Sequence, residues 1–258
     1  MALAPDLPTI GLITDETLGK GKVVVTTAGQ VRSGPLAALR LGTRWERLHA
    51  SHSYGFVLSL VFVSFAFTAL MPGTTWSEAA LVLVEASILA VALLTSGLPF
   101  GRYAVPLILL TGLVTAVTLA AADTSFTRSS AAVVELAYLV GVICVIGAGV
   151  VDQGDLNSQS VLGALSIYVT VGMLFTVLYG VLADLGDAPF FVQGTDGDPA
   201  TRLYFSFVTL ATLGYGDFSP GGDLGRMMAV IEALIGQVYL VTVVALIVGN
   251  LGRHRERR

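Results

Sequence analysis

Residues 198–220 read DPATRLYFSFVTLATLGYGDFSP, and this stretch decides how the chain is built. Asp198 is a residue type favoured as a helix N-cap and Pro199 suits the first helical turn, so the sequence predicts a short helix over residues 199–211. The loop TLGYGD at residues 212–217 follows at once. Two glycines around an aromatic residue end a helix and allow backbone angles that other residues resist. The stretch therefore predicts a short helix that runs into an irregular loop.

The composition around this stretch excludes an ordinary soluble protein. Of the 258 residues, 54% are apolar and only 12% are charged, and the mean hydropathy is +0.80. Soluble domains carry about 25% charged residues, and disordered chains are far less apolar. The formal net charge of -4 gives no general basic character for nucleic-acid binding. A protein with several membrane spans is the class that remains.

Six apolar segments are long enough to be considered as membrane spans. A helix needs about 20 apolar residues to cross a bilayer core of about 30 Å. Runs without Lys or Arg cover residues 54–71, 78–96, 103–122, 131–151 and 161–183, and a sixth apolar run covers about residues 225–251. The quoted stretch lies between the last two runs and is too short and too polar to cross. Irregular backbone at membrane depth is tolerated only where protein buries it or where it lines a watery path. We therefore predict an all-α membrane protein with six transmembrane helices and a re-entrant helix and loop between the last two.

Basic residues divide unequally between the two ends of these spans. Of the 14 basic residues, six lie in residues 1–53, four in the tail at 252–258, and Arg102 falls on the same side. Only Arg128, Arg202 and Arg226 fall on the other side. The positive-inside rule then predicts a cell-membrane protein with both termini in the cytoplasm. Within the N-terminal segment, residues 40–48 have the pattern of a basic amphipathic helix on the inner leaflet, or of an extension of the first span.

The loop at residues 212–217 resembles the selectivity-filter motif of the potassium-channel family, which usually reads TVGYGD. The resemblance covers roughly residues 161–251, as an outer helix, a pore helix, the filter and an inner helix. It implies a homotetramer in membrane lipid, in which the loops of four copies surround one axis. The carbonyl groups that would replace the water around K⁺ are those of Thr212, Leu213, Gly214 and Tyr215. The Thr212 hydroxyl would complete the innermost site, Gly216 and Asp217 would end the filter, and the Tyr215 ring would pack into a surrounding cuff.

The inner helix contains candidate gating residues. Gly236 lies twenty residues after Gly216, the spacing at which similar channels carry a glycine hinge, with close helix packing as the alternative. Val244, Ile247 and Leu251 recur at helical spacing and are candidates for an apolar inner gate that closes by dewetting.

Three residues are candidates for supporting the filter from behind. Glu232 is an acid inside a spanning helix, which is costly without partners, so we expect it to be hydrogen-bonded to the pore helix or protonated. Tyr204 and Phe205 stand where many relatives have Trp, and Val208 stands where some have an acid. The acids near the outer mouth, which would attract cations or simply be solvated, are Asp184, Asp187, Asp196, Asp198, Asp217 and Asp223.

The four front helices, residues 54–151, occupy the place of a voltage sensor without its charges. The run at 131–151 contains no Lys or Arg, whereas a voltage sensor needs several such charges. A classical voltage sensor is therefore not expected. Glu85 and Glu135 lie inside the second and fourth runs, and neither has an obvious basic partner within a span.

These features predict a potassium-selective channel, with two alternatives. One is a weakly selective channel for monovalent cations, and the other is a secondary transporter that uses Glu85 and Glu135 as proton carriers. Transporters usually carry paired repeats, and residues 54–151 hold no second copy of the filter stretch. Catalytic clusters are missing from the sequence too, so we expect no enzyme and no cofactor apart from K⁺ as the permeant ion. The expected partners are other copies of the chain, lipid and K⁺, without nucleic acid.

Overall fold

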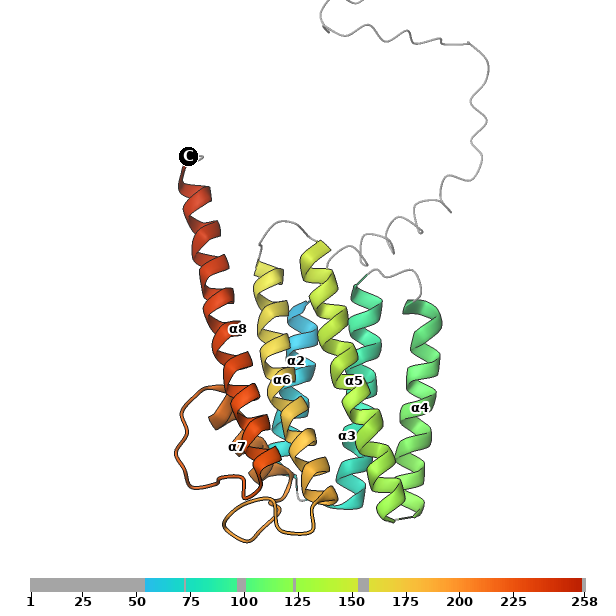
Figure 1. Ribbon diagram of the computed structural model, residues 1–258. Coiled ribbons are helices and arrows are strands. Elements are labelled where there is room, and N and C mark those ends of the chain that lie inside the picture. The colour runs from blue at the N-terminus through green and yellow to red at the C-terminus, as the bar shows by residue number, and fades with distance from the viewer. Residues whose placement is uncertain (1–53, 72, 97–100, 123, 153–157, 257–258) are drawn as a thin grey trace, which may run out of the picture. The chain divides into compact units, whose positions relative to one another are not determined.

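The computed structural model describes residues 54–71, 73–96, 101–122, 124–152 and 158–256. Within these residues there are seven helices and no strand beyond isolated bridges. The helices are α2 (Tyr54–Leu70), α3 (Thr75–Thr95), α4 (Gly101–Ala121), α5 (Ser125–Asp152), α6 (Ser158–Leu185), α7 (Pro199–Leu210) and α8 (Asp223–Glu256), as Figure 1 shows. The prediction of an all-helical protein is thus confirmed, while the amphipathic helix predicted at residues 40–48 lies outside the described residues.

Five of the described helices are long and apolar enough to cross a membrane. Their apolar portions are Thr75–Thr95, Tyr103–Ala121, Ser125–Val151, Ser158–Leu185 and Asp223–Leu246. Helix α2 is equally apolar but has 17 residues, which at about 1.5 Å per residue is slightly shorter than a bilayer core. The structure therefore supports a membrane protein with five spans of sufficient length, and the role of α2 as a sixth is a proposal.

Two of the spans that begin earlier than the predicted apolar runs do so because polar caps start their helices. Thr74 and Ser77 exchange hydrogen bonds at the start of α3, so that helix begins at Thr75. Thr124 and Thr127 do the same before α5. Arg128 therefore lies in the first turn of α5, well outside the run of residues 131–151.

The short helix between the last two spans is confirmed. The Asp198 carboxylate accepts a hydrogen bond of 2.7 Å from the Thr201 backbone N–H, and Pro199 occupies the first turn. This hydrogen bonding lowers the pKa of Asp198, as expected for a carboxylate at an N-cap. The helix ends at Leu210, one residue before the predicted end.

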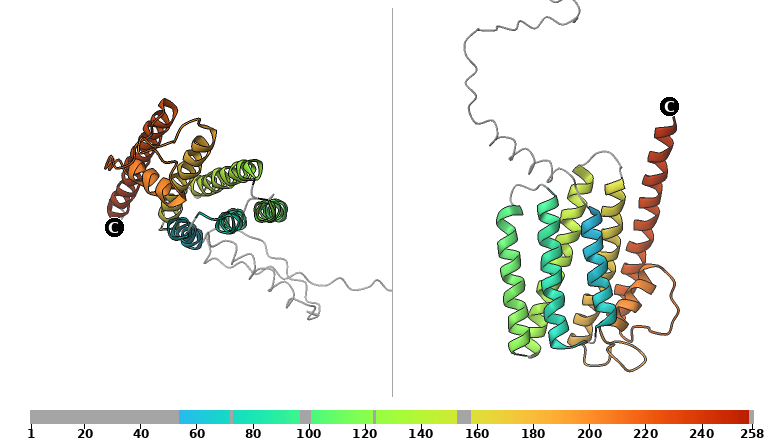
Figure 2. Two further views of the ribbon diagram at one scale, coloured as in Figure 1. Left: turned by 90° about the horizontal axis from the view of Figure 1, so that it is seen from below. Right: turned by 180° about the vertical axis from the view of Figure 1, so that it is seen from behind.

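The front helices pack around one apolar core. Helix α3 contacts α2, α4 and α5, while α2 and α5 both contact α6 (Figure 2). Gly112 of α4 lies against Ala86 of α3, where an added Cβ would come within 2.8 Å of the Ala86 methyl. Small residues here let α3 and α4 approach closely.

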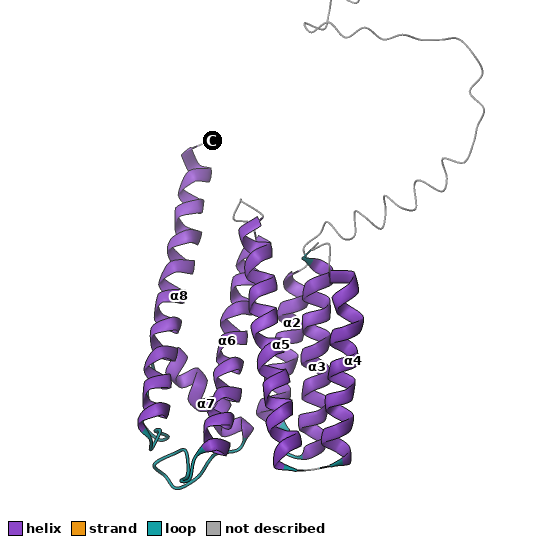
Figure 3. Ribbon diagram, turned by 45° about the vertical axis from the view of Figure 1, so that its right-hand side comes forward, coloured by secondary structure: helices purple, strands orange, loops and turns teal. Residues whose placement is uncertain are grey.

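Helix α7 lies between α6 and α8, at the end where the loops connect them (Figure 3). A second cluster of buried aromatic residues fixes it there, with Phe205 of α7 packed against Tyr179 of α6 and against Phe190 and Phe191 of the loop. Helix α8 contacts α6 and α7 and leaves most of its apolar side chains exposed, among them Leu234, Val238 and Val241. The loop of residues 211–217 is therefore held between the end of α7 and the start of α8.

Candidate functional site

Every second residue of the loop after α7 has a left-handed backbone. The φ angles are +57° at Thr212, +56° at Gly214 and +78° at Gly216. Glycine adopts this conformation without steric cost, as its place in the motif predicts. Thr212 is different, because a β-branched residue at positive φ is strained by about 1–3 kcal/mol. Nothing in the sequence predicts this strain at Thr212.

The last turn of α7 sets the direction of the peptide groups in this loop. The backbone N–H groups of Leu213 and Gly214 both donate to the Val208 carbonyl, at 2.9 and 3.4 Å. In a trans peptide the carbonyl of one residue points opposite to the N–H of the next. The carbonyl groups of Thr212 and Leu213 therefore point away from α7. This orientation points them to the side of the loop that faces away from α7, where they could act as ligands.

Asp217, at the end of the loop, is held by two side chains from earlier in the chain. The Tyr204 hydroxyl of α7 donates to the Asp217 carboxylate at 2.7 Å, and this hydrogen bond raises the pKa of Tyr204. The Gln193 amide donates to the Asp217 backbone carbonyl at 2.6 Å. Tyr204 thus contacts Asp217 directly, and its role as a support of a filter stays a prediction. Gln193 was missed, because it lies 24 residues earlier in an irregular loop and no spacing links it to Asp217.

Glu232 joins three helices behind the loop. Its side chain is fully buried on α8, where the Tyr179 hydroxyl of α6 donates to one carboxyl oxygen at 2.5 Å. The Ser206 hydroxyl oxygen of α7 lies 2.5 Å from the other carboxyl oxygen and 2.7 Å from the Gly172 carbonyl of α6. Ser206 has a single hydroxyl hydrogen, so it can donate to only one of these two oxygens.

This hydrogen-bond arrangement is complete when Glu232 carries a proton. A protonated Glu232 donates to the Ser206 oxygen, Ser206 donates to Gly172, and Tyr179 donates to the remaining carboxyl oxygen. The sequence offered a hydrogen bond to the predicted pore helix and protonation as alternatives, and contact with Ser206 of α7 is compatible with protonation in one arrangement. The packing partner Tyr179, 53 residues away, was not predicted.

Gly236 allows α8 to pack directly on the end of α7. A Cβ at this position would collide with the backbone carbonyl of Leu210, the last residue of α7. Helix α8 continues from Asp223 to Glu256 through this point. Close packing therefore accounts for the glycine, and its role as a hinge stays a prediction.

The inner-gate residues are only partly described. Val244 is 57% exposed on α8, while the side chains of Ile247 and Leu251 lie outside the described residues. The gate stays a prediction.

Two of the acids near the loop have structural roles. Asp198 caps α7, and the Asp196 carboxylate accepts a hydrogen bond of 2.8 Å from the Phe190 N–H. The Asp223 Oδ1 atom lies 3.9 Å from Nη1 of Arg226, and both side chains are exposed. Within the described residues, no group of three or more His, Cys, Asp or Glu side chains is placed to hold a metal ion.

The loop is uncovered in a single chain. Leu213 is 57% exposed and Tyr215 is 67% exposed, and the space around Gly214 and Gly216 is open. Within the described residues, Tyr215 is therefore not enclosed, and the cuff stays a prediction.

Comparison with known proteins points to the part of the chain that holds this loop. Residues 163–252, 90 of the 258 residues, match a family model described as "Ion channel". A segment of 51 residues is 43% identical to "Probable potassium channel protein 2" of Methanocaldococcus jannaschii. That alignment covers 19% of this chain and 15% of the relative. No solved structure matches the chain.

Proposed function

We propose that the chain forms a potassium-selective channel and that residues 212–217 are its selectivity filter. The observation that carries this proposal is the alternating backbone of the loop, with the Thr212 and Leu213 carbonyl groups turned away from α7. Carbonyl oxygens in rings replace the hydration shell of K⁺ in such filters. The ion-channel family match over residues 163–252 and the name of the partial relative agree with this function. The ion ligands are then the carbonyl groups of Thr212, Leu213, Gly214 and Tyr215.

The exposed loop supports an assembly of four copies. Irregular backbone cannot face lipid, because its polar groups would lack partners there. One chain leaves residues 211–217 exposed, together with much of the apolar surface of α8. Neighbouring copies would cover both surfaces, and four copies would close a ring of carbonyl groups around an ion.

The front helices complete the proposed topology. With α2 as a first span, six helices cross the cell membrane, both termini are cytoplasmic, and the loops beside α7 face outward. Arg128 is the only Lys or Arg in α5, and it lies in the first turn rather than in a series along the helix. The channel then opens without a classical voltage sensor.

Ion flux through the purified protein tests this function. In liposomes, we expect K⁺ to pass at least about tenfold faster than Na⁺, with block by external Ba²⁺, because the carbonyl ring selects by ion coordination. Equal K⁺ and Na⁺ flux would favour the weakly selective cation channel instead. Absence of flux for either ion, in protein shown to be folded and tetrameric, contradicts the channel.

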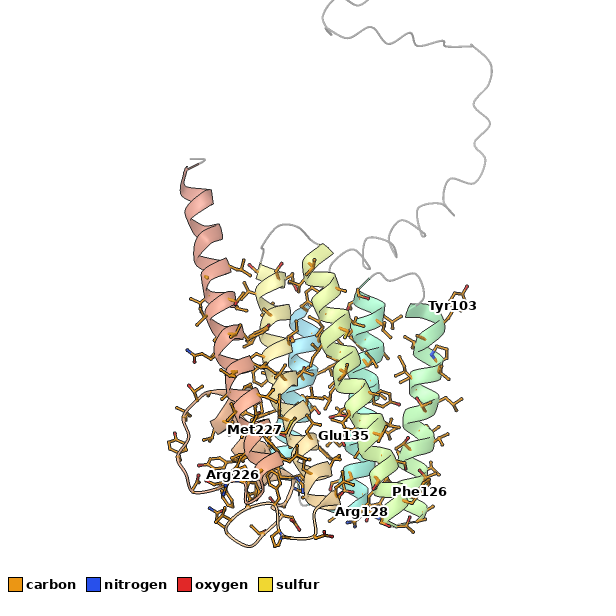
Figure 4. The ribbon with its side chains drawn as sticks, in the orientation of Figure 1. Tyr103, Phe126, Arg128, Glu135, Arg226 and Met227 are labelled. Atoms are coloured by element: carbon orange, nitrogen blue, oxygen red, sulfur yellow. The ribbon has the colours of Figure 1, made fainter. Side chains whose placement is uncertain are left out.

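Tyr204→Phe tests the brace on Asp217. The change removes one hydroxyl that donates to an ionised group, an interaction of about 1.5–3 kcal/mol in general. We expect K⁺ conduction to begin normally and to decay several-fold faster during sustained recording, because the outer end of the filter loses a tie to the pore helix. Tyr103→Phe is the control, because Tyr103 lies at the start of α4, at the end of the helices that is far from the loops beside α7 (Figure 4). A Tyr204→Phe channel whose currents last as long as those of the control would show that the hydrogen bond does not stabilise the filter.

A further inference from the structure

A polar cavity lies among the front helices and the pore helix. Its volume is about 200 Å³, and α3, α5, α6 and α7 supply its charged lining. Arg128 at the start of α5 and Asp184 at the end of α6 are exposed at its mouth, whereas Glu85 lies buried at its inner end. Figure 4 shows Arg128 at one end of α5 and Glu135 further along the same helix. On α3 the inner acid Glu85 follows Glu78 by seven positions, and on α5 the inner acid Glu135 follows Arg128 by seven positions. Seven positions correspond to about 10 Å along a helix. The cavity thus reaches about two helical turns into the protein.

The Glu85 carboxyl group is buried without a hydrogen-bond donor in the described part of the protein. The residue is 2% exposed, and neither carboxyl oxygen receives a hydrogen bond from any donor there. The carboxyl group of Glu135 comes within hydrogen-bonding range of the Glu85 carboxyl group, and Glu135 is partly buried. Two ionised carboxylates are both acceptors and cannot hydrogen-bond to each other. The pair therefore needs a proton between them, as other close carboxylate pairs do.

The pore helix contributes the cation that faces this pair. Arg202 of α7 lines the cavity, and its guanidinium lies over Gly180 of α6, where an added Cβ would be 3.3 Å from Cζ. One nitrogen, Nη1, donates to the Gly197 carbonyl at 3.0 Å, while Nε has no hydrogen-bond partner in the described structure. Arg202 is attracted by the carboxylates around the cavity, Glu135 among them.

The other groups facing the pair complete its electrostatic surroundings. Besides Glu85 and Glu135, the charged residues that line the cavity are Glu78 from α3, Arg128 from α5, Asp184 from α6 and Arg202 from α7. Helices α2 and α4 contribute no charged residue to the lining, and Tyr138 of α5, which lies near Glu85, donates its hydroxyl to the Ile108 carbonyl. Glu85 and Glu135 are thus the deepest ionisable acids, and Arg202 links them to the pore helix.

We propose that Glu85 and Glu135 form a proton-binding site open to the filter side of the membrane, and that Arg202 transmits its occupancy to the pore. The regulatory part of this proposal rests on the proposed channel function. A second proton removes the remaining charge of the pair, so the attraction on Arg202 falls. Arg202 precedes Tyr204 by two residues on α7, and Tyr204 holds Asp217 at the end of the filter. Acid on the filter side therefore loosens the pore helix and reduces conduction.

Infrared spectroscopy of the reconstituted protein tests the proton site without any need for conduction. The difference spectrum between wild type and Glu85→Gln should contain the carbonyl stretch of a protonated carboxyl group near neutral pH, and so should the spectrum for Glu135→Gln. Glu232 is present in all these proteins and cancels in the difference. Asp187→Asn, an exposed residue outside the cavity, is the control and should remove no such signal. If Glu85→Gln and Glu135→Gln leave the protonated-carboxyl signal unchanged, the proton site is wrong, whether or not the protein conducts.

Flux measurements at two pH values test the link to the pore. We expect wild-type K⁺ flux to fall at least about threefold when the filter side is taken from about pH 8 to about pH 5, across the range of perturbed carboxyl groups. The double variant Glu85→Gln/Glu135→Gln should conduct at both pH values with less than half of that change, whereas Asp187→Asn should keep it. An undiminished pH response in the double variant overturns the link through Arg202. If the double variant does not fold, the same comparison is made with each single variant. A wild type that conducts at neither pH overturns the channel function and the link together, while the infrared result still decides the proton site.

Discussion

Replacing Gly214 by Ala is expected to abolish K⁺ flux, with a loss of at least about tenfold in liposomes. Gly214 has a φ angle of +56°, a conformation that costs an L-residue about 1–2 kcal/mol. Four copies in one ring multiply this cost to about 4–8 kcal/mol, which favours a different backbone in the filter. Since the Thr212 and Leu213 carbonyl groups are oriented through hydrogen bonds to Val208, a changed backbone at Gly214 disturbs the ion ligands directly.

Gly194→Ala is the matched control for this change. Gly194 also has a positive φ, +79°, and open space around the position of a Cβ, but it lies in the loop before α7. The same backbone strain is introduced outside residues 212–217, beside Gln193, so K⁺ flux and selectivity should change far less than in Gly214→Ala. Transport that survives Gly214→Ala would contradict the filter assignment and favour the transporter alternative.

Replacing Gly236 by Ala is expected to destabilise the protein. The added methyl group would meet the Leu210 carbonyl, and a backbone atom can move only if α7 or α8 moves with it. Overpacking of this kind costs about 1–3 kcal/mol per copy. Thermal unfolding in detergent should therefore begin several degrees lower, with earlier loss of the oligomer.

A second helical glycine makes the control for Gly236. Gly147 of α5 has nothing within 4 Å of the position of a Cβ, so Gly147→Ala adds only helix propensity. Its effect should be neutral or stabilising, by up to about 1 kcal/mol. The two substitutions thus have opposite expected signs. If Gly236→Ala unfolds like wild type but opens and closes abnormally, the hinge is the better explanation for this residue.

Local signals in the sequence predicted much of the fold and only part of the site. The N-cap at Asp198 and the glycines at 214 and 216 predicted α7 and the irregular loop, because capping and backbone freedom depend on single residues. Helix starts were less accurate, since the pairs Thr74–Ser77 and Thr124–Thr127 extended helices beyond their apolar runs.

Contacts between distant segments could not be read from the sequence. Gln193 with Asp217, and Tyr179 with Glu232, join residues that share no periodicity. The same holds for Glu85 and Glu135, which looked unpartnered within their spans and line the same cavity as Arg202 of α7. Such pairs depend on how helices pack, and this is a property of the whole fold.

The contact between Gly236 of α8 and Leu210 of α7 has a mechanical consequence for the opening of the proposed channel. Leu210 is two residues before Thr212, so α8 packs directly on the backbone that leads into the loop of residues 212–217. At this point the Leu210 backbone carbonyl, with the Leu210 side chain beside it, lies directly against α8. If residues 212–217 form the proposed filter, a tilt or bend of α8 here would displace the proposed ion ligands, and this loop and α8 would move together.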